Sequence, residues 1–213
     1  MRTPLSVLRG EIQALQDGVR APTAAALASL NAECDRLGGL VEDLYQLALA
    51  DVGALEYRFE ELDAAEIVRE SLAAHRHAFA DAGIEVEADF APAPPVRADA
   101  RRLGQLVDNL LANARRHTDA PGRVRVAVSA SAEQVRVVVE DSPPGVPAAA
   151  LPHLFDRLYR VDGSRSRAAG GAGLGLAIGQ AIAHAHAGSI DASASTLGGL
   201  RIELVLPAIR SSP

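Results

Sequence analysis

The hydrophobic periodicity of the chain changes near residue 54, and this change divides it into two parts. Before residue 54, apolar side chains recur every third or fourth position, as on one face of an α-helix. Gly18 and Pro22 interrupt the pattern, and Thr23 is a suitable N-cap for a second helix. We therefore predict an antiparallel helical hairpin over residues 1–54.

The apolar seam of the second helix is narrow and sustained, as in a coiled coil. It consists of Leu27, Leu30, Cys34, Leu37, Val41, Leu44 and Ala48. Two helices with such seams bury little surface by themselves, so pairing with a second copy would complete a four-helix bundle. We favour a homodimer formed through this hairpin over the alternative, in which both helices pack on the rest of the chain.

From residue 55 onward, segments that alternate like strands are mixed with helical ones. Strands are expected over residues 55–62, 84–90, 123–130, 134–140, 189–195 and 199–206, and helices over 64–82, 99–117 and 174–187, with a short helix near Leu151. This order predicts an antiparallel or mixed sheet with helices mostly on one face. The expected fold class is α+β, with the hairpin followed by a two-layer α/β sandwich over residues 55–213.

The composition excludes several classes of protein. The net charge is -6, and the 21 basic residues, all arginine, form no basic tract. This balance argues against nucleic acid as the main partner. A single cysteine, Cys34, excludes an intrachain disulfide and a multi-cysteine metal site. Because the sequence lacks a run of about 18 apolar residues, we expect no membrane segment in it.

A polar face runs along the helix expected at residues 99–117. Asn109, Asn113, Arg116 and His117 lie at helical spacing beside an apolar stripe. An amide oxygen suits a Mg²⁺ ion that already carries phosphate oxygens, and a nearby arginine would meet the phosphates. The alternative is a partly exposed polar face without a ligand.

Residues 140–146 form a Pro/Gly turn directly after a valine-rich strand. The carboxylate of Asp141, at the strand end, can accept a hydrogen bond from the amino group of adenine. Gly145 would let the backbone approach the base closely. Taken by itself, the segment is better explained as an ordinary turn.

A glycine-rich string at residues 170–175 opens an apolar helix. Backbone N–H groups at such a helix start bind phosphate. The string follows a polar loop and precedes no Lys-Ser or Lys-Thr pair, which excludes a dinucleotide fingerprint and a P-loop. The loop before it contains Arg157, Arg160, Arg165 and Arg167. It suits either a mobile lid over an anion or a solvated basic loop.

Together these segments resemble the catalytic region of bacterial sensor histidine kinases, in the ATPase superfamily that includes gyrase, Hsp90 and MutL. Residues 105–118 are similar to the N box, 141–145 to the first glycine box, 155–160 to the F box and 171–175 to the second glycine box. The opening Arg2-Thr3-Pro4-Leu5 resembles the end of the phosphoacceptor box at the start of the dimerisation hairpin. The Asp-Ser-Pro-Pro-Gly turn is similar to that of the BaeS-type subgroup.

The resemblance implies an ATP site that also holds Mg²⁺. By similarity, Asn113 would bind Mg²⁺, Asn109 would support it and Arg116 would contact phosphate. His117 would lie beside the nucleotide, and Asp141 would bind the adenine amino group. The full set implied for ATP binding is Asn109, Asn113, Arg116, His117, Asp141, Gly145, Arg160, Gly171, Gly173, Leu174, Gly175 and Leu176.

The sequence departs from the family pattern at several positions. Met1 stands where the family has the leucine of His-Glu-Leu, so the phosphoacceptor histidine would lie upstream and is absent from this chain. Pro143 replaces a usual glycine, and Ala172 replaces the frequent serine or threonine. In the F box, Leu158 replaces a phenylalanine, while Arg160 would help to place the lid. Nucleotide binding is expected to survive these changes.

The other histidines are not expected to substitute for the missing one. His75 and His77, like His184 and His186, are two residues apart and would point in different directions on a helix. His153 stands alone. We therefore expect no functional role for these five residues.

These inferences predict the ATP-binding catalytic core of a two-component sensor histidine kinase. The γ-phosphoryl group of ATP would pass to a histidine, absent here, and then to an aspartate of a response-regulator receiver domain, without autophosphorylation of this chain. The alternative is a catalytically silent module that dimerises, binds the regulator and binds ATP without phosphotransfer. An ATP-hydrolysing enzyme is less favoured, because the N-box helix has no evident glutamate to activate water. The chain is expected in the cytoplasm, as the cytosolic portion of an inner-membrane sensor protein.

Overall fold

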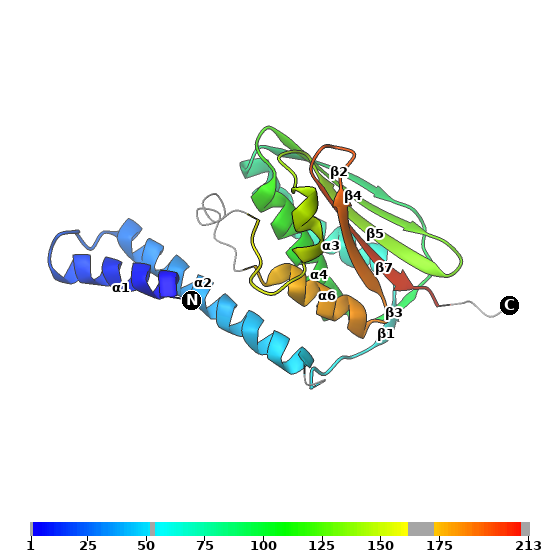
Figure 1. Cartoon of the computed structure of the whole chain (residues 1–213), viewed down its shortest axis with the longest axis horizontal. Coiled ribbons are helices and arrows are strands. Elements are labelled where there is room, and N and C mark those ends of the chain that lie inside the picture. The colour runs from blue at the N-terminus through cyan, green and yellow to red at the C-terminus, as the bar shows by residue number, and fades with distance from the viewer. Residues whose placement is uncertain (1, 52–53, 162–172, 210–213) are drawn as a thin grey trace. The chain divides into compact units, whose positions relative to one another are not determined.

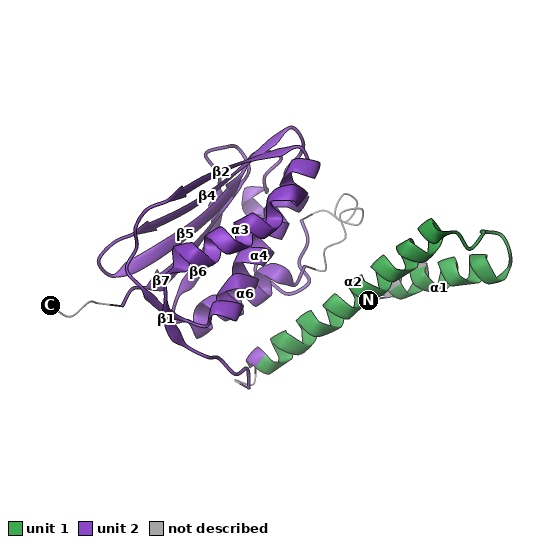
Figure 2. Ribbon diagram, turned by 180° about the vertical axis from the view of Figure 1, so that it is seen from behind, with its two compact units in different colours: residues 1–49 green, residues 50–213 purple. Residues whose placement is uncertain are grey.

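The structure is a computed structural model that describes residues 2–51, 54–161 and 173–209. The chain divides into two compact units, residues 1–49 and residues 50–213, which Figure 2 colours separately. In the described ranges, no helix is both long and apolar enough to cross a lipid bilayer.

The first unit contains two helices, α1 (Arg2–Gln16) and α2 (Ala24–Asp51), the second of which extends just beyond it. Thr23 precedes α2, and its Oγ1 accepts a hydrogen bond from the backbone N–H of Ala26 at 3.2 Å. The predicted helical hairpin and its N-cap are confirmed. On this single chain, several apolar side chains of the hairpin stay between 40% and 66% exposed: Leu5, Ile12, Leu27, Val41 and Tyr45.

The second unit is an α+β domain of two layers. Its elements are β1 (Glu60–Leu62), α3 (Ala64–Asp81), β2 (Ile84–Phe90), β3 (Val96–Ala98), α4 (Ala100–His117), β4 (Gly122–Ala130), β5 (Gln134–Asp141), the 3₁₀-helix η1 (Ala148–His153), α6 (Gly175–Ala185), β6 (Ser189–Ala194) and β7 (Leu200–Pro207). Five strands form a sheet in the order β2-β4-β5-β7-β6, in which only β2 and β4 are parallel. The helices α3, α4 and α6 cover one face of this sheet (Figure 1), as predicted.

The strand expected at residues 55–62 is shorter than its alternation indicates. Only its last three residues, β1, pair with another strand, the equally short β3. The alternating aromatic residues before β1 pack on each other instead, with the rings of Tyr57 and Phe59 stacked 5.6 Å apart. Strand β3 was not predicted, because three residues are too few to show the alternation of a strand.

The core lies between the sheet and its helices. Along β4, β5 and β7 every second side chain is apolar and buried, because successive residues of a strand point to opposite faces. These side chains are Val124, Val126, Val128, Val135, Val137, Val139, Leu200, Ile202, Leu204 and Leu206. Leucines of α4, among them Leu103, Leu106 and Leu110, are at most 1% exposed and supply the helical side of this core. The sheet thereby fixes α4 in place.

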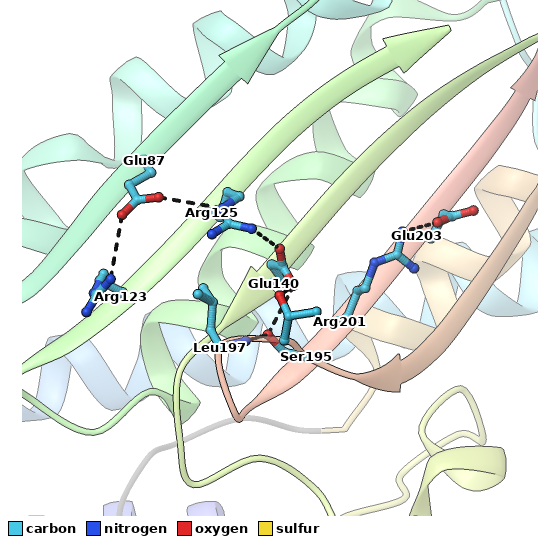
Figure 3. A network of polar contacts seen from close by, with 9 residues as sticks. Glu87, Arg123, Arg125, Glu140, Ser195, Leu197, Arg201 and Glu203 are labelled. Atoms are coloured by element: carbon cyan, nitrogen blue, oxygen red, sulfur yellow. Dashed lines mark hydrogen bonds and ion pairs between the residues drawn. The ribbon is translucent and has the colours of Figure 1, made fainter. Parts of the chain in front are cut away.

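The opposite face of the sheet holds a row of alternating charges. Glu87 lies opposite Arg125, Arg125 opposite Glu140, and Glu140 opposite Arg201 in the strand register. Figure 3 shows the contacts within the row: Arg125 reaches Glu87 at 3.5 Å and Glu140 at 2.9 Å. Opposite charges on neighbouring strands stabilise the sheet by a few tenths of a kcal/mol to about 1 kcal/mol per pair.

Candidate functional site

The helix α4 brings Asn109 to the start of α6. Asp99 caps α4, since its Oδ1 accepts a hydrogen bond from the Arg102 N–H at 2.9 Å. One turn apart on α4, Asn109 and Asn113 share a face. Asn109 Nδ2 donates to the carbonyl oxygen of Gly175, the first residue of α6, at 3.2 Å. Asn109 thus binds the two helices together at this point.

The amide of Asn113 is free to bind a ligand. The residue is half-buried, and among the described residues nothing hydrogen-bonds its side chain. An amide that faces solvent with an unused oxygen suits an oxygen-preferring cation.

Asp141 ends β5 on the helix side of the sheet, whereas its neighbour Glu140 points to the charged outer face. The Asp141 side chain is buried, and its Oδ1 accepts a hydrogen bond from the Leu200 N–H at 2.7 Å. Burial raises the pKa of this carboxyl to about 6, the Leu200 hydrogen bond opposes the rise, and the charge of Glu140 adds to it. A buried carboxylate with one oxygen bound to the backbone and the other left over can accept one further donor.

The turn between β6 and β7 packs against the first glycine box. Gly145 has a φ of +69°, and a Cβ there would lie 3.1 Å from the carbonyl oxygen of Gly198. A Cβ on Gly198, whose φ is +96°, would lie 3.1 Å from the ring of Pro143. Both glycines are therefore required by the protein's own packing, a reason for Gly145 that is independent of a bound base.

Glu140 holds the same turn from the outer face. Its Oε2 accepts hydrogen bonds from the hydroxyl groups of Ser195 at 3.1 Å and Thr196 at 3.2 Å, and Figure 3 shows Ser195 beneath it. The backbone N–H of Gly199 in turn donates to the carbonyl oxygen of Asp141. This support for Asp141 was not predicted from the sequence. The adjacent glycines Gly198 and Gly199 are the sequence signal that could have indicated a tight turn here.

The second glycine box is joined to the F box through Gly173. Its φ is +72°, and a Cβ there would lie 2.7 Å from the carbonyl oxygen of Tyr159. Its own carbonyl oxygen accepts a hydrogen bond from the Leu158 N–H at 2.9 Å. Gly171 lies outside the described residues, as does Ala172. The part of this box that the structure describes therefore starts at Gly173.

The two leucines of the predicted site differ in position. Leu174 is only 1% exposed and belongs to the core, while Leu176 is half-buried on the first turn of α6. Gly175 lies between them, and a Cβ on it would make ordinary contact with the Asn109 side chain at 3.5 Å. Of the three, Leu174 is placed to position the box and not to touch a ligand.

Positive groups of α4 and of the F box lie close enough to repel one another. Burial lowers the pKa of the Arg116 guanidinium, and the charges of Arg115 and Arg160 lower it further. Burial likewise lowers the pKa of His117, followed by the charges of Arg116 and Arg160. Two arginines, Arg116 and Arg160, therefore lie near each other at this end of α4, where they would attract an anion.

These features fit ATP with Mg²⁺. The spare oxygen of Asp141 matches a nucleobase amino group, the arginines match a polyphosphate, and the Asn113 amide matches a hard cation. The described residues contain no cluster of three His, Cys, Asp or Glu side chains that could hold a metal ion. Mg²⁺ bound mainly by phosphate oxygens and water, with one amide from the protein, needs no such cluster.

Two protein-family profiles match the chain. The profile of histidine kinase-, DNA gyrase B- and HSP90-like ATPases matches residues 98–210, which include every predicted site residue. The profile of the His kinase A (phospho-acceptor) domain matches residues 1–53.

Individual relatives agree with both profiles. The chain is 44% identical to the signal transduction histidine-protein kinase BaeS of Escherichia coli K12, over 99% of this chain and 45% of that protein. The structure of the Acinetobacter baumannii histidine kinase AdeS covers 99% of the chain with a TM-score of 0.80 and 28% identity. The histidine kinase ThkA, in a complex with the response regulator TrrA, has the same fold, with a TM-score of 0.75 and 20% identity. The chain spans less than half the length of the curated relative.

Proposed function

The chain belongs to the family of histidine kinase-, DNA gyrase B- and HSP90-like ATPases, and on that premise we propose that it is the ATP-binding catalytic core of a two-component sensor histidine kinase. In this role it transfers the γ-phosphoryl group of ATP to a histidine of a dimerisation hairpin, from which an aspartate of a response regulator receives it. The observation that carries the proposal is the half-buried Asn113 amide, which no described residue hydrogen-bonds, on the helix whose Asn109 holds the start of α6. The cluster of Arg116 and Arg160 lies near this helix end, where it would meet the phosphates.

The proposed roles of the site residues follow from their positions. Asp141 accepts a hydrogen bond from the adenine amino group, and the arginines of the cluster bind the phosphates. Asn113 holds Mg²⁺, which offsets phosphate charge when it is bound, and Asn109 keeps the start of α6 beside it. Phosphoryl transfer requires mainly such positioning and charge neutralisation.

The hairpin is proposed to form a homodimer and to dock the receiver domain of a response regulator. Support comes from the phospho-acceptor profile over residues 1–53 and from the exposed apolar side chains of α1 and α2. The ThkA structure with TrrA supports a regulator as partner. The chain is further proposed to be the cytosolic portion of a longer inner-membrane sensor, in line with its 45% coverage of BaeS.

Substitution of Asn113 tests the nucleotide site. An Asn113→Asp variant of the full chain places a carboxylate where the amide meets Mg²⁺ and triphosphate, so affinity for a fluorescent ATP analogue with Mg²⁺ should fall about tenfold or more. Asn31→Asp makes the same change on an exposed position of α2 and should leave the affinity unchanged. Equal affinity of Asn113→Asp and the parent would contradict the proposal.

A second candidate is a catalytically silent module that binds ATP and a regulator without phosphotransfer. This alternative is favoured by Pro143, which stands where the family usually has a glycine. The ring of Pro143 lies beside Gly198, so it occupies space that a glycine would leave open. Supplying a hairpin that carries the family's phosphoacceptor histidine, with radiolabelled ATP, separates the two. Label on that histidine supports the kinase, and its absence despite ATP binding supports the silent module.

A further inference from the structure

Asp99 connects three segments at the end of α4 that is remote from Asn113. Its Oδ1 caps α4, and its Oδ2 accepts a hydrogen bond from the Arg58 N–H at 2.7 Å. Its own backbone N–H donates to Nε2 of His186 at 3.0 Å. The residue is 5% exposed, so these hydrogen bonds are protected from water.

His186 uses both of its ring nitrogens. The backbone N–H of Asp99 can only donate, so Nε2 accepts and the ring proton lies on Nδ1, which donates to the carbonyl oxygen of Ile182 at 2.8 Å. The ring is 3% exposed and meets the edges of Tyr57 and Phe59 at centroid distances of 5.6 and 5.2 Å. The two hydrogen bonds fix the orientation of the ring and join the C-cap of α6 to the N-cap of α4.

The helices α4 and α6 run antiparallel and are bound to each other at two points. The start of α6 meets the middle of α4 through Gly175 and Asn109, and its C-cap, His186, meets the residue that caps α4, Asp99. Between these points Gly179 faces Leu106, where a Cβ would lie 3.7 Å from the leucine side chain. Close packing along this line lets a contact at one end set the position of the other.

We propose that Asp99 and His186 are positioning residues of the ATP site, because they fix the axial register of α6 on α4. The inference rests on the proposed nucleotide site. The register decides where the start of α6, whose first N–H groups have no acceptor within the helix itself, stands relative to Asn109 and Asn113. It also assigns a role to His186, for which the sequence indicated none. Asp99 and His186 touch neither ATP nor Mg²⁺ in this role.

Two substitutions of His186 separate positioning from simple packing. In His186→Asn the shorter amide reaches Ile182 but loses the acceptor for Asp99, whereas in His186→Gln the longer side chain presents an amide oxygen to the Asp99 N–H. Both variants lose the same aromatic contacts with Tyr57 and Phe59. His184→Asn, at an exposed position two residues earlier on α6, is the matched control.

Two readouts are measured on the full chain for each variant. The first is affinity for a fluorescent ATP analogue with Mg²⁺, and the second is the NMR signal of the Asn109 side-chain amide without nucleotide. We expect His186→Asn to bind the analogue about tenfold more weakly, which corresponds to the loss of one buried hydrogen bond. We also expect this variant to shift the Asn109 signal. His186→Gln should stay within about threefold of the parent, and His184→Asn should match it.

The outcomes discriminate clearly. Equal effects of His186→Asn and His186→Gln on both readouts would show a packing role only and would overturn the proposal, as would an unmoved Asn109 signal in His186→Asn. If the parent protein itself binds no analogue, the proposed function fails, and the nucleotide-free Asn109 signal alone decides the positioning role. A His186→Asn variant that fails to fold while His186→Gln folds and keeps the Asn109 signal would support it.

Discussion

Oδ1 of Asp141 accepts the backbone N–H of Leu200 at 2.7 Å, so the last residue of β5 is bound to the first residue of β7. The contact holds the carboxyl in a buried place where its charge is unfavourable, as the pKa of about 6 shows. The residue proposed to bind adenine therefore destabilises the nucleotide-free domain at neutral pH.

Replacing Asp141 by asparagine should stabilise the domain while weakening nucleotide binding. Because the folded pKa is raised, the stability that protonation contributes is present below the ordinary pKa of 3.8 and is lost as pH rises through about 6. Asp141→Asn should thus raise the free energy of unfolding by about 2–3 kcal/mol at pH 8 and by little at pH 4. Denaturant unfolding at both pH values measures this. A lower stability of the variant at pH 8 would refute the argument.

Nucleotide affinity of the parent should fall as pH drops through about 6, because a protonated Asp141 is a poorer acceptor for the adenine amino group. Titration with an ATP analogue at pH 5 and pH 8 measures the effect. The control is His117→Gln, which removes the other titrating group of the site. The loss of affinity in acid should persist in this variant and be at least as large as in the parent, because protonation of His117 favours the bound phosphates.

Gly173 should be indispensable and Gly175 tolerant of a methyl group in the folded domain. Gly173→Ala combines a φ of +72° with a 2.7 Å approach to the Tyr159 carbonyl oxygen, so at least about 1–2 kcal/mol of stability should be lost. Gly175→Ala adds only ordinary contact with Asn109 and is the matched control. Thermal unfolding compares the two, and an equal loss in both would contradict the assigned geometry.

Removing the charge of Arg116 should raise the pKa of His117, since that charge is one of the groups that lower it. NMR titration of the imidazole in Arg116→Gln measures the direction. Saturation of the parent with an ATP analogue should move the pKa the same way, because phosphate charge offsets the arginines. Arg76→Gln, at an exposed position of α3, should leave the titration of His117 unchanged.

Asp99→Asn should release the chain at Arg58 while keeping the cap of α4. The amide oxygen still accepts the Arg102 N–H, but an NH₂ group then faces the Arg58 N–H, so exchange of the Arg58 amide with solvent should accelerate.

Although burial raises the pKa of Asp99, the hydrogen bonds from Arg58 and Arg102 lower it overall. Its contribution to stability is therefore present above the ordinary pKa of 3.8 and is lost as pH falls below it. The variant should be less stable by about 1–2 kcal/mol at pH 7, and the difference should shrink in acid.

A charge in the apolar seam of the hairpin should prevent dimerisation. Val41 is 66% exposed on the single chain, so Val41→Glu should leave the protomer folded and shift it to the monomer. Sedimentation equilibrium measures the mass. Ser29→Glu, also exposed on α2, is the control and should dimerise like the parent.

Sequence periodicity predicted those elements whose pattern is local. The alternating valines of β4 and β5 and the asparagine face of α4 lie where they were expected, because burial on one side of a strand or helix dictates its spacing. The aromatic alternation at Tyr57 and Phe59 misled, since it reflects packing on His186 and not strand pairing.

Long-range contacts account for what the sequence could not predict. The role of Leu200 depends on β7 lying beside β5, 59 residues apart in sequence at this contact. The bond between Asp99 and His186 spans 87 residues. Neither pairing leaves a local pattern, so only the folded chain brings these residues together.

The position of β7 has a consequence for the protein during its synthesis. This strand leaves the ribosome after the other strands of the sheet, yet it lies between β5 and β6 and supplies the N–H that holds Asp141. A nascent chain that has reached α6 already contains the N box and both glycine boxes but cannot close its sheet. The proposed adenine contact of Asp141 should therefore form only after β7 has left the ribosome and paired with β5.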